Sequence, residues 1–357
     1  MTEPVLRVSD LRVHFPVRRG LLARRAGTVK AVDGLSLCLN AGRTLALVGE
    51  SGCGKSTTAR AILRLVPATA GRIELGGTDI GTLGGRRLRQ ARRDAQMVFQ
   101  DPHASLDPRM TVLDIIAEPL RAHGIVRARG AMVREVAEIM EQVGLCAAFL
   151  RRYPHELSGG QCQRVGIARA LALRPKVIIA DEPLSALDLS IRAQIINLLV
   201  DLQRKTDIAY LLIAHDLAVV RHIAHDVAVM YLGRVVEQAP AERLFARPGH
   251  PYSQALLSAM AVPDPVCERG RQRLPLAGEP PSPLDPPAGC AFHPRCRHAF
   301  APCRGEEPAL RDRGDGQLVR CHLDEPPAFA APWHRAGPGA APGTAAGAGE
   351  EGQACSG

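Results

Sequence analysis

The fold of this 357-residue chain is decided by the stretch Gly49-Glu50-Ser51-Gly52-Cys53-Gly54-Lys55-Ser56. It matches the pattern G-x-x-x-x-G-K-[ST] at every specified position. A short apolar run at residues 44–48 precedes it, and residues 57–65 have a helical composition that ends before Pro67. A strand, a glycine loop and a helix in this order form the context in which the pattern binds phosphate.

The residue types of this stretch suit a bound triphosphate. Glycines let the backbone turn tightly and direct several N–H groups at phosphate oxygens. Lys55 supplies a positive charge for the β- and γ-phosphates, and Ser56 supplies an oxygen for Mg²⁺. A chance glycine turn is the alternative, and the flanking strand and helix favour nucleotide binding over it. The predicted nucleotide-binding residues of this region are Gly49, Glu50, Ser51, Gly52, Cys53, Gly54, Lys55, Ser56 and Thr57.

A carboxylate pair, Asp181-Glu182, follows the apolar run at residues 177–180. A carboxylate at the end of a buried strand can hold Mg²⁺ through the water shell of the ion, so Asp181 is a predicted metal ligand. An adjacent Glu182 can orient or deprotonate an attacking water. The alternative is a helix cap, because Pro183 and Ser185 come next.

The overall composition is that of an ordinary globular protein, with 46% hydrophobic and 23% charged residues. Aromatic residues make up only 3%, too few for the stacking surfaces with which most proteins bind single-stranded nucleic acid. The 45 basic and 36 acidic residues give a formal net charge of +9. That charge suits an anionic ligand or a membrane-facing surface, and we expect no nucleic-acid partner.

The chain carries no sign of a membrane span or of export. No window approaches the run of about 18 apolar residues that crosses a bilayer. The first ten residues include Glu3 and Asp10 and lack an apolar core, so no secretory signal is expected. We therefore expect a cytoplasmic chain whose ten cysteines form no structural disulfides.

The N-terminal residues alternate in a way that predicts a half-buried strand. The apolar residues expected to share one face of it are Leu6, Val8, Leu11, Val13 and Phe15. An arginine- and glycine-rich insert at residues 18–27 is expected to interrupt this strand. Its pattern resumes at Val29.

The rest of the chain alternates strands with helices. Residues 101–173 have a mostly helical composition, and residues 210–214 form another buried-strand candidate that closes on His215. This alternation predicts an α/β fold with a parallel sheet covered on both faces. The prolines at which helices are expected to start or stop are Pro102, Pro108, Pro119 and Pro154.

The stretch Leu157-Ser158-Gly159-Gly160-Gln161 distinguishes between classes of phosphate-loop protein. By itself it is an N-cap and turn that opens a helix, whose free N–H groups and dipole would bind phosphate. It resembles the signature of the ATP-binding-cassette (ABC) ATPases, which kinases and GTPases lack. The order of motifs over residues 5–325 resembles that family as well, running through Gly49–Ser56, Gln100, Ser158–Gln161, Asp181-Glu182, Asp188 and His215.

The resemblance implies two cassettes arranged head to tail, with ATP between the phosphate loop of one and the signature of the other. Glu182 would then be the general base, Gln100 would sense Mg²⁺ and the attacking water, and Asp188 would link the two cassettes. A core phenylalanine at Phe15 and a satisfied core histidine at His215 are the structural alternatives. The implied catalytic residues are Glu182, His215 and Gln100, the Mg²⁺ ligands are Ser56, Gln100 and Asp181, and the further ATP-binding residues are Phe15, Ser158, Gly159, Gly160, Gln161 and Asp188.

Several stretches resemble one subfamily, the oligopeptide/dipeptide importers, and within it the F-type ATPase subunit. They are residues 100–110, 153–156, 159–164, 214–220, 230–233 and 250–252. The implied fold is an ABC-type phosphate-loop NTPase with a mixed sheet core, in which residues 1–262 form the ATPase domain and about 101–173 its helical subdomain. Residues 263–325 would be a proline-rich linker and a C-terminal extension with four cysteines, and residues 326–357 a disordered tail.

The subfamily resemblance also implies partners and a location. The chain would couple ATP hydrolysis to peptide uptake at the cytoplasmic face of the inner membrane. It would work with two transmembrane permease subunits, a second, D-type ATPase subunit and, indirectly, an extracytoplasmic solute-binding protein. The alternatives are a soluble ABC ATPase of a non-transport complex, such as one for phosphonate breakdown, or an importer of nickel or another small solute.

Four cysteines gather near the C-terminus: Cys290, Cys296, Cys303 and Cys321. In a segment with little core they suggest a metal staple. The spacing lacks the C-x₂-C pairs usual for zinc, and the ligands could also include His293, His298 and His322. The segment resembles the cysteine motif of the same importer subfamily, some members of which hold a [4Fe–4S] cluster. Zinc and free thiols remain alternatives.

Overall fold

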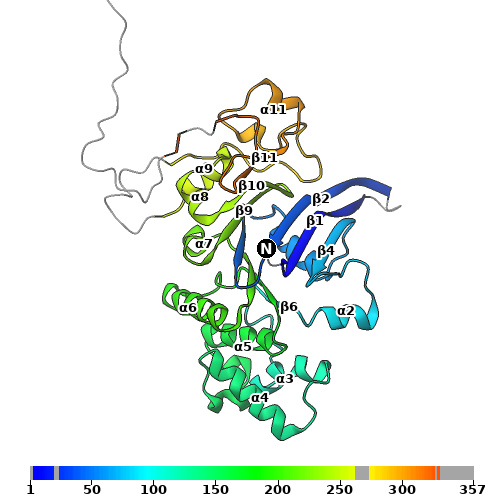
Figure 1. The fold of residues 1–357 in the computed structure, drawn as a ribbon, viewed down its shortest axis with the longest axis vertical. Coiled ribbons are helices and arrows are strands. Elements are labelled where there is room, and N and C mark those ends of the chain that lie inside the picture. The colour runs from blue at the N-terminus through cyan, green and yellow to red at the C-terminus, as the bar shows by residue number, and fades with distance from the viewer. Residues whose placement is uncertain (1–2, 20–23, 262–272, 326–327, 330–357) are drawn as a thin grey trace, which may run out of the picture.

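Residues 3–19, 24–261, 273–325 and 328–329 are described by a computed structural model of the chain (Figure 1). Their largest element is an eight-stranded sheet in the order β11-β12-β10-β9-β3-β8-β7-β6. Its central strands are parallel to one another. They are β9 (Asp226–Tyr231), β3 (Thr44–Val48), β8 (Ala209–Ile213), β7 (Val177–Asp181) and β6 (Ala95–Val98).

The large sheet is covered on both faces, as expected for a parallel α/β sheet. Ala46 and Val48 of β3 join a core cluster with the helices, whereas Leu45 and Leu47 join a second cluster with the N-terminal strands. Every residue of β3, β7 and β8 is buried. The predicted fold class, with its mixed sheet, is confirmed: antiparallel strands β10 (Arg234–Pro240), β12 (Leu318–Arg320) and β11 (Leu310–Asp312) complete one side.

A second, antiparallel sheet in the order β2-β1-β4-β5 packs against this core. Leu6, Val8, Leu11 and Val13 of β1 are all buried, as predicted. Val8 and Leu11 are three residues apart and would point to opposite faces of a regular strand. They share a face because a register shift lies between them. The strands are β1 (Leu6–Arg19), β2 (Arg24–Leu39), β4 (Ala70–Leu75) and β5 (Thr78–Asp79).

Two expectations for the start of the chain are wrong. Phe15 is no core residue, since its side chain is 40% exposed. Residues 18–19 and 24–27 of the insert do not interrupt the strands, because β1 and β2 continue through them as an antiparallel pair with Arg18 opposite Arg25 and Arg19 opposite Arg24. The backbone hydrogen bonds of an antiparallel pair need no apolar side chains, so the composition of the insert concealed its strands.

The helices of residues 101–173 lie at one end of the long axis of the molecule (Figure 1). Pro119 was expected to bound a helix, but it lies inside α3. Burial of Val112, Ile115, Ile116 and Leu120 outweighs the one hydrogen bond that a proline removes. The elements are α3 (Val112–Ala122), α4 (Arg129–Gln142), η1 (Ala147–Arg151), η2 (Pro154–Glu156) and α5 (Gly159–Leu171).

The remaining helices cover the sheets or belong to the C-terminal extension. Helix α1 ends at Ile62, three residues before the expected end, and Arg64 takes a left-handed conformation there. These helices are α1 (Lys55–Ile62), α2 (Gly85–Ala91), α6 (Leu189–Thr206), α7 (Leu217–Ile223), α8 (Ala241–Ala246), α9 (Pro251–Ser258), η3 (His293–Arg295) and α11 (Ala301–Gly305). None of the helices described is long and apolar enough to cross a membrane.

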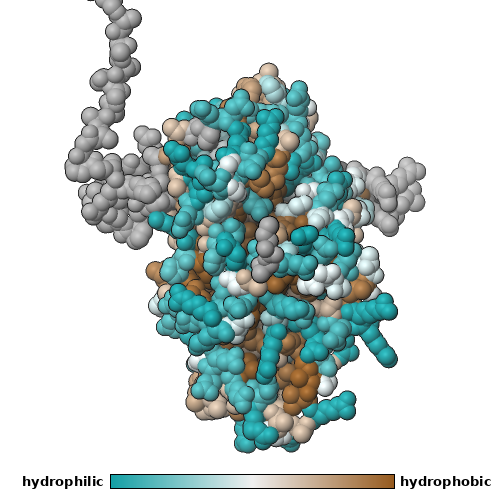
Figure 2. Space-filling view, viewed as in Figure 1, coloured by the Kyte–Doolittle hydropathy of each residue, from teal (hydrophilic) through white to brown (hydrophobic). Residues whose placement is uncertain are grey.

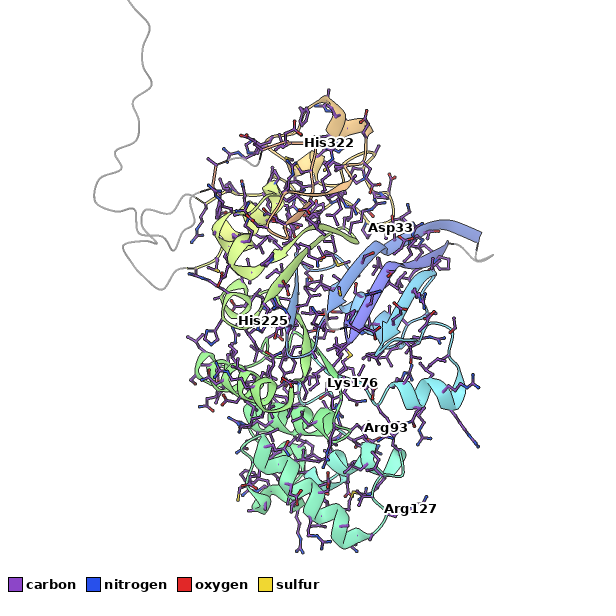
Figure 3. All side chains as sticks on the ribbon, in the orientation of Figure 1. Asp33, Arg93, Arg127, Lys176, His225 and His322 are labelled. Carbon is purple, nitrogen blue, oxygen red and sulfur yellow. The ribbon has the colours of Figure 1, made fainter. Side chains whose placement is uncertain are left out.

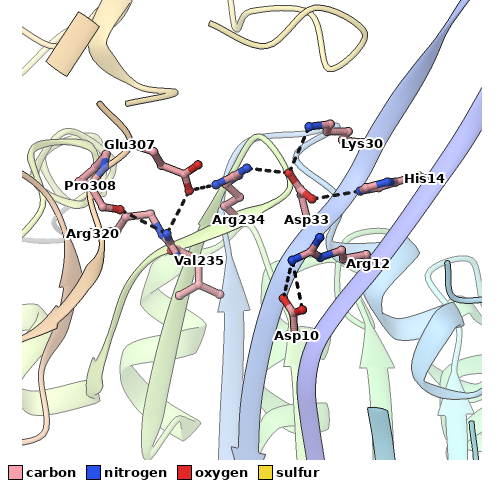
Figure 4. Close-up of polar contacts among 10 residues, drawn as sticks. All are labelled: Asp10, Arg12, His14, Lys30, Asp33, Arg234, Val235, Glu307, Pro308 and Arg320. Carbon is pink, nitrogen blue, oxygen red and sulfur yellow. Dashed lines mark hydrogen bonds and ion pairs between the residues drawn. The ribbon is translucent and has the colours of Figure 1, made fainter. Parts of the chain in front are cut away.

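The C-terminal extension, residues 273–325 among those described, is joined to the rest of the large sheet by strand pairing and by charge. Strand β12 pairs with β10, with Glu237 opposite Val319. Arg234 of β10 forms ion pairs with Asp33 of β2 and with Glu307 of the extension, and Arg320 also pairs with Glu307 (Figure 4). One chain of charges thus connects the second sheet, the large sheet and the extension.

The predicted linker is described over residues 273–289, and almost all of the predicted tail is not. Residues 273–289 contain no helix or strand, but they pack on the core: Leu274 donates a hydrogen bond to Ser258, and Lys30 donates one to the carbonyl of Pro283. The tail predicted to be disordered lies outside the described residues except for Ala328 and Phe329. Phe329 packs against the main core cluster.

Glu237 fastens the extension from a fully buried position. Its carboxylate accepts hydrogen bonds from the backbone N–H groups of Gly249 and His250 and from Nε2 of Gln317, at 2.7–2.9 Å. Gln317 precedes β12, so the carboxylate ties the loop before α9 to the extension. Removal of this acceptor leaves the buried N–H groups of Gly249 and His250 without a partner, whereas Gln317 Nε2 keeps its hydrogen bond to the carbonyl oxygen of Arg247 at 2.9 Å.

We therefore expect Glu237→Ala to lower the free energy of unfolding by about 3 kcal/mol, because each orphaned buried donor is costly. Urea unfolding followed by circular dichroism measures this change. The matched control is Glu242→Ala on the exposed face of α8, which should change the free energy by less than about 0.5 kcal/mol. Equal effects of the two substitutions would contradict the role of Glu237.

Candidate active site

The phosphate loop fits between β3 and α1 only because it contains glycine. Gly49, Gly52 and Gly54 have φ values of 152°, 79° and 109°, a region that L side chains rarely adopt. A Cβ atom at Gly49 would collide with the carbonyl oxygen of Met230, and one at Gly54 with that of Ala31. The close approach of these neighbouring strands therefore sets the shape of the loop, whose end opens helix α1 at Lys55.

Lys55 is buried within the curve of the loop. Its Nζ donates hydrogen bonds to the carbonyl oxygens of Gly49 at 2.8 Å and Glu50 at 3.0 Å. Burial raises the pKa of the neighbouring Cys53 thiol, although the positive charge of Lys55 opposes that shift. The ammonium group is therefore held at the centre of the loop, where phosphate oxygens would meet it.

The two residues expected to serve Mg²⁺ from this loop and from β7 lie together. Ser56 Oγ donates a hydrogen bond to Asp181 Oδ1 over 2.9 Å. Burial raises the pKa of Asp181, and the hydrogen bond from Ser56 opposes the shift. A hydroxyl and a carboxylate are oxygen ligands of the kind that Mg²⁺ prefers, so the pair suits the ion.

Glu182 is the meeting point of the three predicted catalytic residues. Its Oε2 accepts a hydrogen bond from Gln100 Nε2 at 2.9 Å and lies 3.3 Å from His215 Nδ1. These residues follow β7, β6 and β8, whose carboxyl ends share one edge of the sheet. The backbone of Glu182 has a φ of 46°, and a non-glycine residue kept in that region is a sign of functional constraint.

The helix-cap alternative for Asp181 and Glu182 is wrong. The next helix, α6, begins at Leu189, with Asp188 as its N-cap residue. The satisfied-core alternative for His215 is also wrong, because its side chain is 55% exposed. Neither Asp181 nor Glu182 is therefore used as a helix cap, and His215 is accessible at the edge of the sheet.

A cavity of about 280 Å³ lies in front of these residues. Lys55, Ser56, Gln100 and Glu182 all line it, so the phosphate loop and the catalytic group face one space. The cavity is also lined by residues that sequence reasoning missed, namely Val29, Lys30, Ala31, Leu232, Gly233 and Pro283. No local pattern marks them, because β2, the turn after β9 and the linker bring them together only in the folded chain.

The signature residues stand apart from this cavity. Ser158 caps α5 in a reciprocal pair: its Oγ accepts from the N–H of Gln161, and Gln161 Oε1 accepts from the N–H of Ser158. Ser158 is exposed, and none of the residues 158–161 is among the described residues that line the cavity. A phosphate that met this helix end would therefore belong to a nucleotide held elsewhere.

Phe15 and Asp188 are exposed as well. Phe15 lies opposite Val29, which lines the cavity, but Phe15 itself is not among the described residues that line it. Asp188 lies at the exposed start of α6. The structure thus brings together the phosphate loop, Asp181, Glu182, Gln100 and His215. Phe15, Asp188 and the signature residues 158–161 are not among the described residues that line the cavity.

The four C-terminal cysteines share one neighbourhood. The N–H of Cys290 donates to the carbonyl of Cys303, and burial raises the pKa of the Cys290 and Cys321 thiols and that of Cys296 to about 11. Within the part of the chain that the structure describes, no three His, Cys, Asp or Glu side chains are arranged to hold a metal ion. The arrangement therefore adds no support for zinc or for a cluster.

Comparison with known proteins agrees with this geometry. Residues 32–185 match the family model described as "ABC transporter", and residues 236–303 match "Oligopeptide/dipeptide transporter, C-terminal region". The chain belongs to the ABC transporter ATPases. Its particular place in that family is among the ATP-binding proteins that carry the oligopeptide/dipeptide C-terminal region.

Several relatives match over almost the whole chain. A probable peptide ABC transporter ATP-binding protein of Sinorhizobium fredii is 52% identical over 92% of this chain and 93% of its own length. The oligopeptide transport ATP-binding protein AppF of Bacillus subtilis is 49% identical over 90% and 98%, and OppF of Salmonella typhimurium is 51% identical over 86% and 92%.

A solved structure with the same fold is a dimeric ATP-binding cassette bound to ADP and phosphate, MJ0796. It is 27% identical, with a TM-score of 0.59, and covers 66% of this chain and 98% of its own.

Glu182→Gln should leave ATP affinity within about threefold of the wild-type value and reduce turnover by a factor of about 10² or more, because an amide cannot accept a proton from water. Calorimetric titration measures the first quantity and phosphate release the second. A matched control, Glu242→Gln, changes an exposed carboxylate far from the cavity. Unchanged turnover in Glu182→Gln would contradict its assignment as general base.

Proposed function

We propose that this chain is the ATP-hydrolysing subunit of an importer that carries peptides across the cytoplasmic membrane. The observation that carries the proposal is that one chain joins the contacts of Ser56 with Asp181 and of Gln100 with Glu182 to an oligopeptide/dipeptide C-terminal region. The relatives at about 50% identity are described as oligopeptide or peptide transport ATP-binding proteins, which favours peptides over nickel or another small solute.

The proposed site residues take the roles that the family resemblance implies. Lys55 and the loop N–H groups bind the phosphates, while Ser56, Asp181 and Gln100 serve Mg²⁺. Glu182 acts as general base, and His215 contacts the γ-phosphate. Three observations support these roles: Lys55, Ser56, Gln100 and Glu182 line one cavity, Ser56 contacts Asp181, and Gln100 and His215 both contact Oε2 of Glu182.

We place two such subunits head to tail, with ATP between them. The exposed Ser158 and α5, which do not line this chain's own cavity, are available to the nucleotide of a partner, and Asp188 is exposed beside the same face. The related cassette with ADP and phosphate is dimeric. A second, related D-type ATPase subunit is the partner that we propose.

The permease contact is proposed at a groove of about 400 Å³ beside Gln100. Phe99 lies in it, directly before Gln100, so a segment seated there would act on the residue that contacts Glu182. Arginines give the groove a basic rim, and together with burial Arg89 and Arg93 lower the pKa of His123. Arg93 and Arg127 lie along this same side of the molecule (Figure 3).

The occupant that fits this groove is an amphipathic, acidic-sided segment of a transmembrane permease. Leu65 and Phe99 supply exposed apolar surface, and Arg169 lies 6.0 Å above the Phe99 ring. Docking there would hold the chain peripherally at the cytoplasmic face of the inner membrane. A solute-binding protein on the other side of the membrane would be an indirect partner.

Leu65→Asp should abolish co-purification of permease subunits from membranes and uptake of a labelled peptide, because it places a charge in the apolar groove. The ATP affinity of the purified chain should be unchanged. The matched control is Phe300→Asp, a change at an exposed apolar residue of the C-terminal extension, 42% exposed against 51% for Leu65. If the wild-type chain brings down no permease and restores no peptide uptake, the proposed function is wrong and a soluble ABC complex becomes the better explanation.

The [4Fe–4S] cluster on Cys290, Cys296, Cys303 and Cys321 stays a prediction that rests on resemblance alone. Its measurement is an iron and acid-labile sulfide assay on anaerobically purified protein, with about four of each expected per chain. Cys146→Ser, at an exposed cysteine elsewhere, should keep this content, and Cys296→Ser should lose it. Zinc in place of iron, or neither element, would contradict the cluster.

A further inference from the structure

Arg295 of the C-terminal extension reaches across the molecule to the phosphate loop. Its Nη1 and Nη2 donate to Oε2 and Oε1 of Glu50 at 2.6 and 3.1 Å, a two-pronged ion pair between residues 245 apart in sequence. Its Nε donates to the carbonyl of Ala277 at 3.1 Å. The Arg295 side chain is only 6% exposed and that of Glu50 26%, so solvent screens this pair less than a surface pair.

The position of Arg295 is itself fixed by a cluster of buried rings. Phe292, one turn earlier, packs against Tyr231 and Tyr252 with ring centroids 5.3 and 5.4 Å apart, and against His250 at 5.6 Å. Aromatic pairs at such distances hold one another in defined geometry. The extension therefore presents the guanidinium group to the loop from a rigid base.

Glu50 is held by three contacts, which join it to the C-terminal extension, to helix α9 and to the lysine of the phosphate loop. Its side chain pairs with Arg295, its N–H donates to Tyr252 Oη at 2.8 Å, and its carbonyl accepts from Lys55 Nζ at 3.0 Å. The same residue thus contacts both the extension and the cation of the loop. A shift of Glu50 would move the carbonyl that orients Lys55.

The charge of Glu50 also matters by itself. A carboxylate in a loop that must bind a polyanionic triphosphate repels the ligand unless a cation neutralises it. Lys55 directs its ammonium group at backbone carbonyls, so the guanidinium of Arg295 is the cation that pairs with this carboxylate among the described residues. Deletion of that guanidinium leaves an unpaired negative charge on the phosphate loop.

We propose that Arg295 is a positioning residue for ATP binding, through which the C-terminal extension neutralises Glu50 and holds the phosphate loop. The extension is then a working part of the ATP site. This assignment goes beyond the proposed peptide transport and does not depend on it, because its test needs only the ATPase chain.

The test is the ATP affinity and the steady-state kinetics of the full-length chain. Arg295→Gln should raise both the Kd and the KM for ATP about fivefold to tenfold and change kcat by less than threefold, because the lost interaction acts on binding. Higher salt should narrow the difference in KM from the wild type, since the cause is charge repulsion. A purely structural loss would not respond to salt in this way.

Two further variants isolate the role of charge. The double variant Glu50→Gln/Arg295→Gln removes the unpaired carboxylate and should return KM to within about threefold of the wild type. Arg295→Lys keeps the positive charge and should stay within the same limit. These two variants decide the question even where Arg295→Gln alone does not fold.

The matched control is Arg297→Gln, which removes an exposed arginine two residues away from the same segment. It should leave KM at the wild-type value. The proposal is overturned if Arg295→Gln has the wild-type KM, if the double variant binds ATP no better than Arg295→Gln, or if Arg297→Gln weakens ATP binding equally.

Discussion

The parallel pairing of β6, β7, β8 and β3 is the constraint on which the site depends. It brings four strand ends to one edge of the sheet, and each supplies part of the chemistry: Gln100, Glu182, His215 and the phosphate loop. In such sheets ligands bind outside the carboxyl ends of the strands. The contacts on one oxygen of Glu182 follow from this register, since a shift of one residue would turn the side chains to the other face.

Most of the local structure could be predicted from the sequence, because local composition determines it. Ser158 caps α5 with Gln161, and the apolar runs before Asp181 and His215 form buried strands. The glycines of the loop predict a tight turn. The structure gives the reason, because a Cβ atom at Gly49 or Gly54 would collide with the carbonyl oxygen of Met230 or Ala31. The roles of Gln100, Glu182 and His215 were predicted from the family resemblance, and their contacts with one another became visible only in the folded chain.

What could not be predicted depends on tertiary contacts. Pro119 lies inside α3 because the buried face of the helix outweighs the lost hydrogen bond, a balance that no local pattern reveals. Lys30 and Pro283 line the nucleotide cavity from distant segments. Arg295 carries no motif at all, and only the folded chain places it on Glu50. The roles assigned to the site residues rest on family resemblance, supported by the cavity that Lys55, Ser56, Gln100 and Glu182 line.

The continuation of the large sheet into the C-terminal extension has a consequence for the integrity of the whole molecule. Strand β12 pairs with the outer side of β10, whose residues are largely buried, and β11 ends the sheet as a short exposed strand (Figure 1). The face of the molecule seen in Figure 2 is mostly hydrophilic. Loss of these two strands, by proteolysis or truncation, would uncover a row of unpaired amide groups flanked by apolar side chains. An exposed sheet edge of this kind can pair with strands of other molecules, so the extension also protects the protein against aggregation.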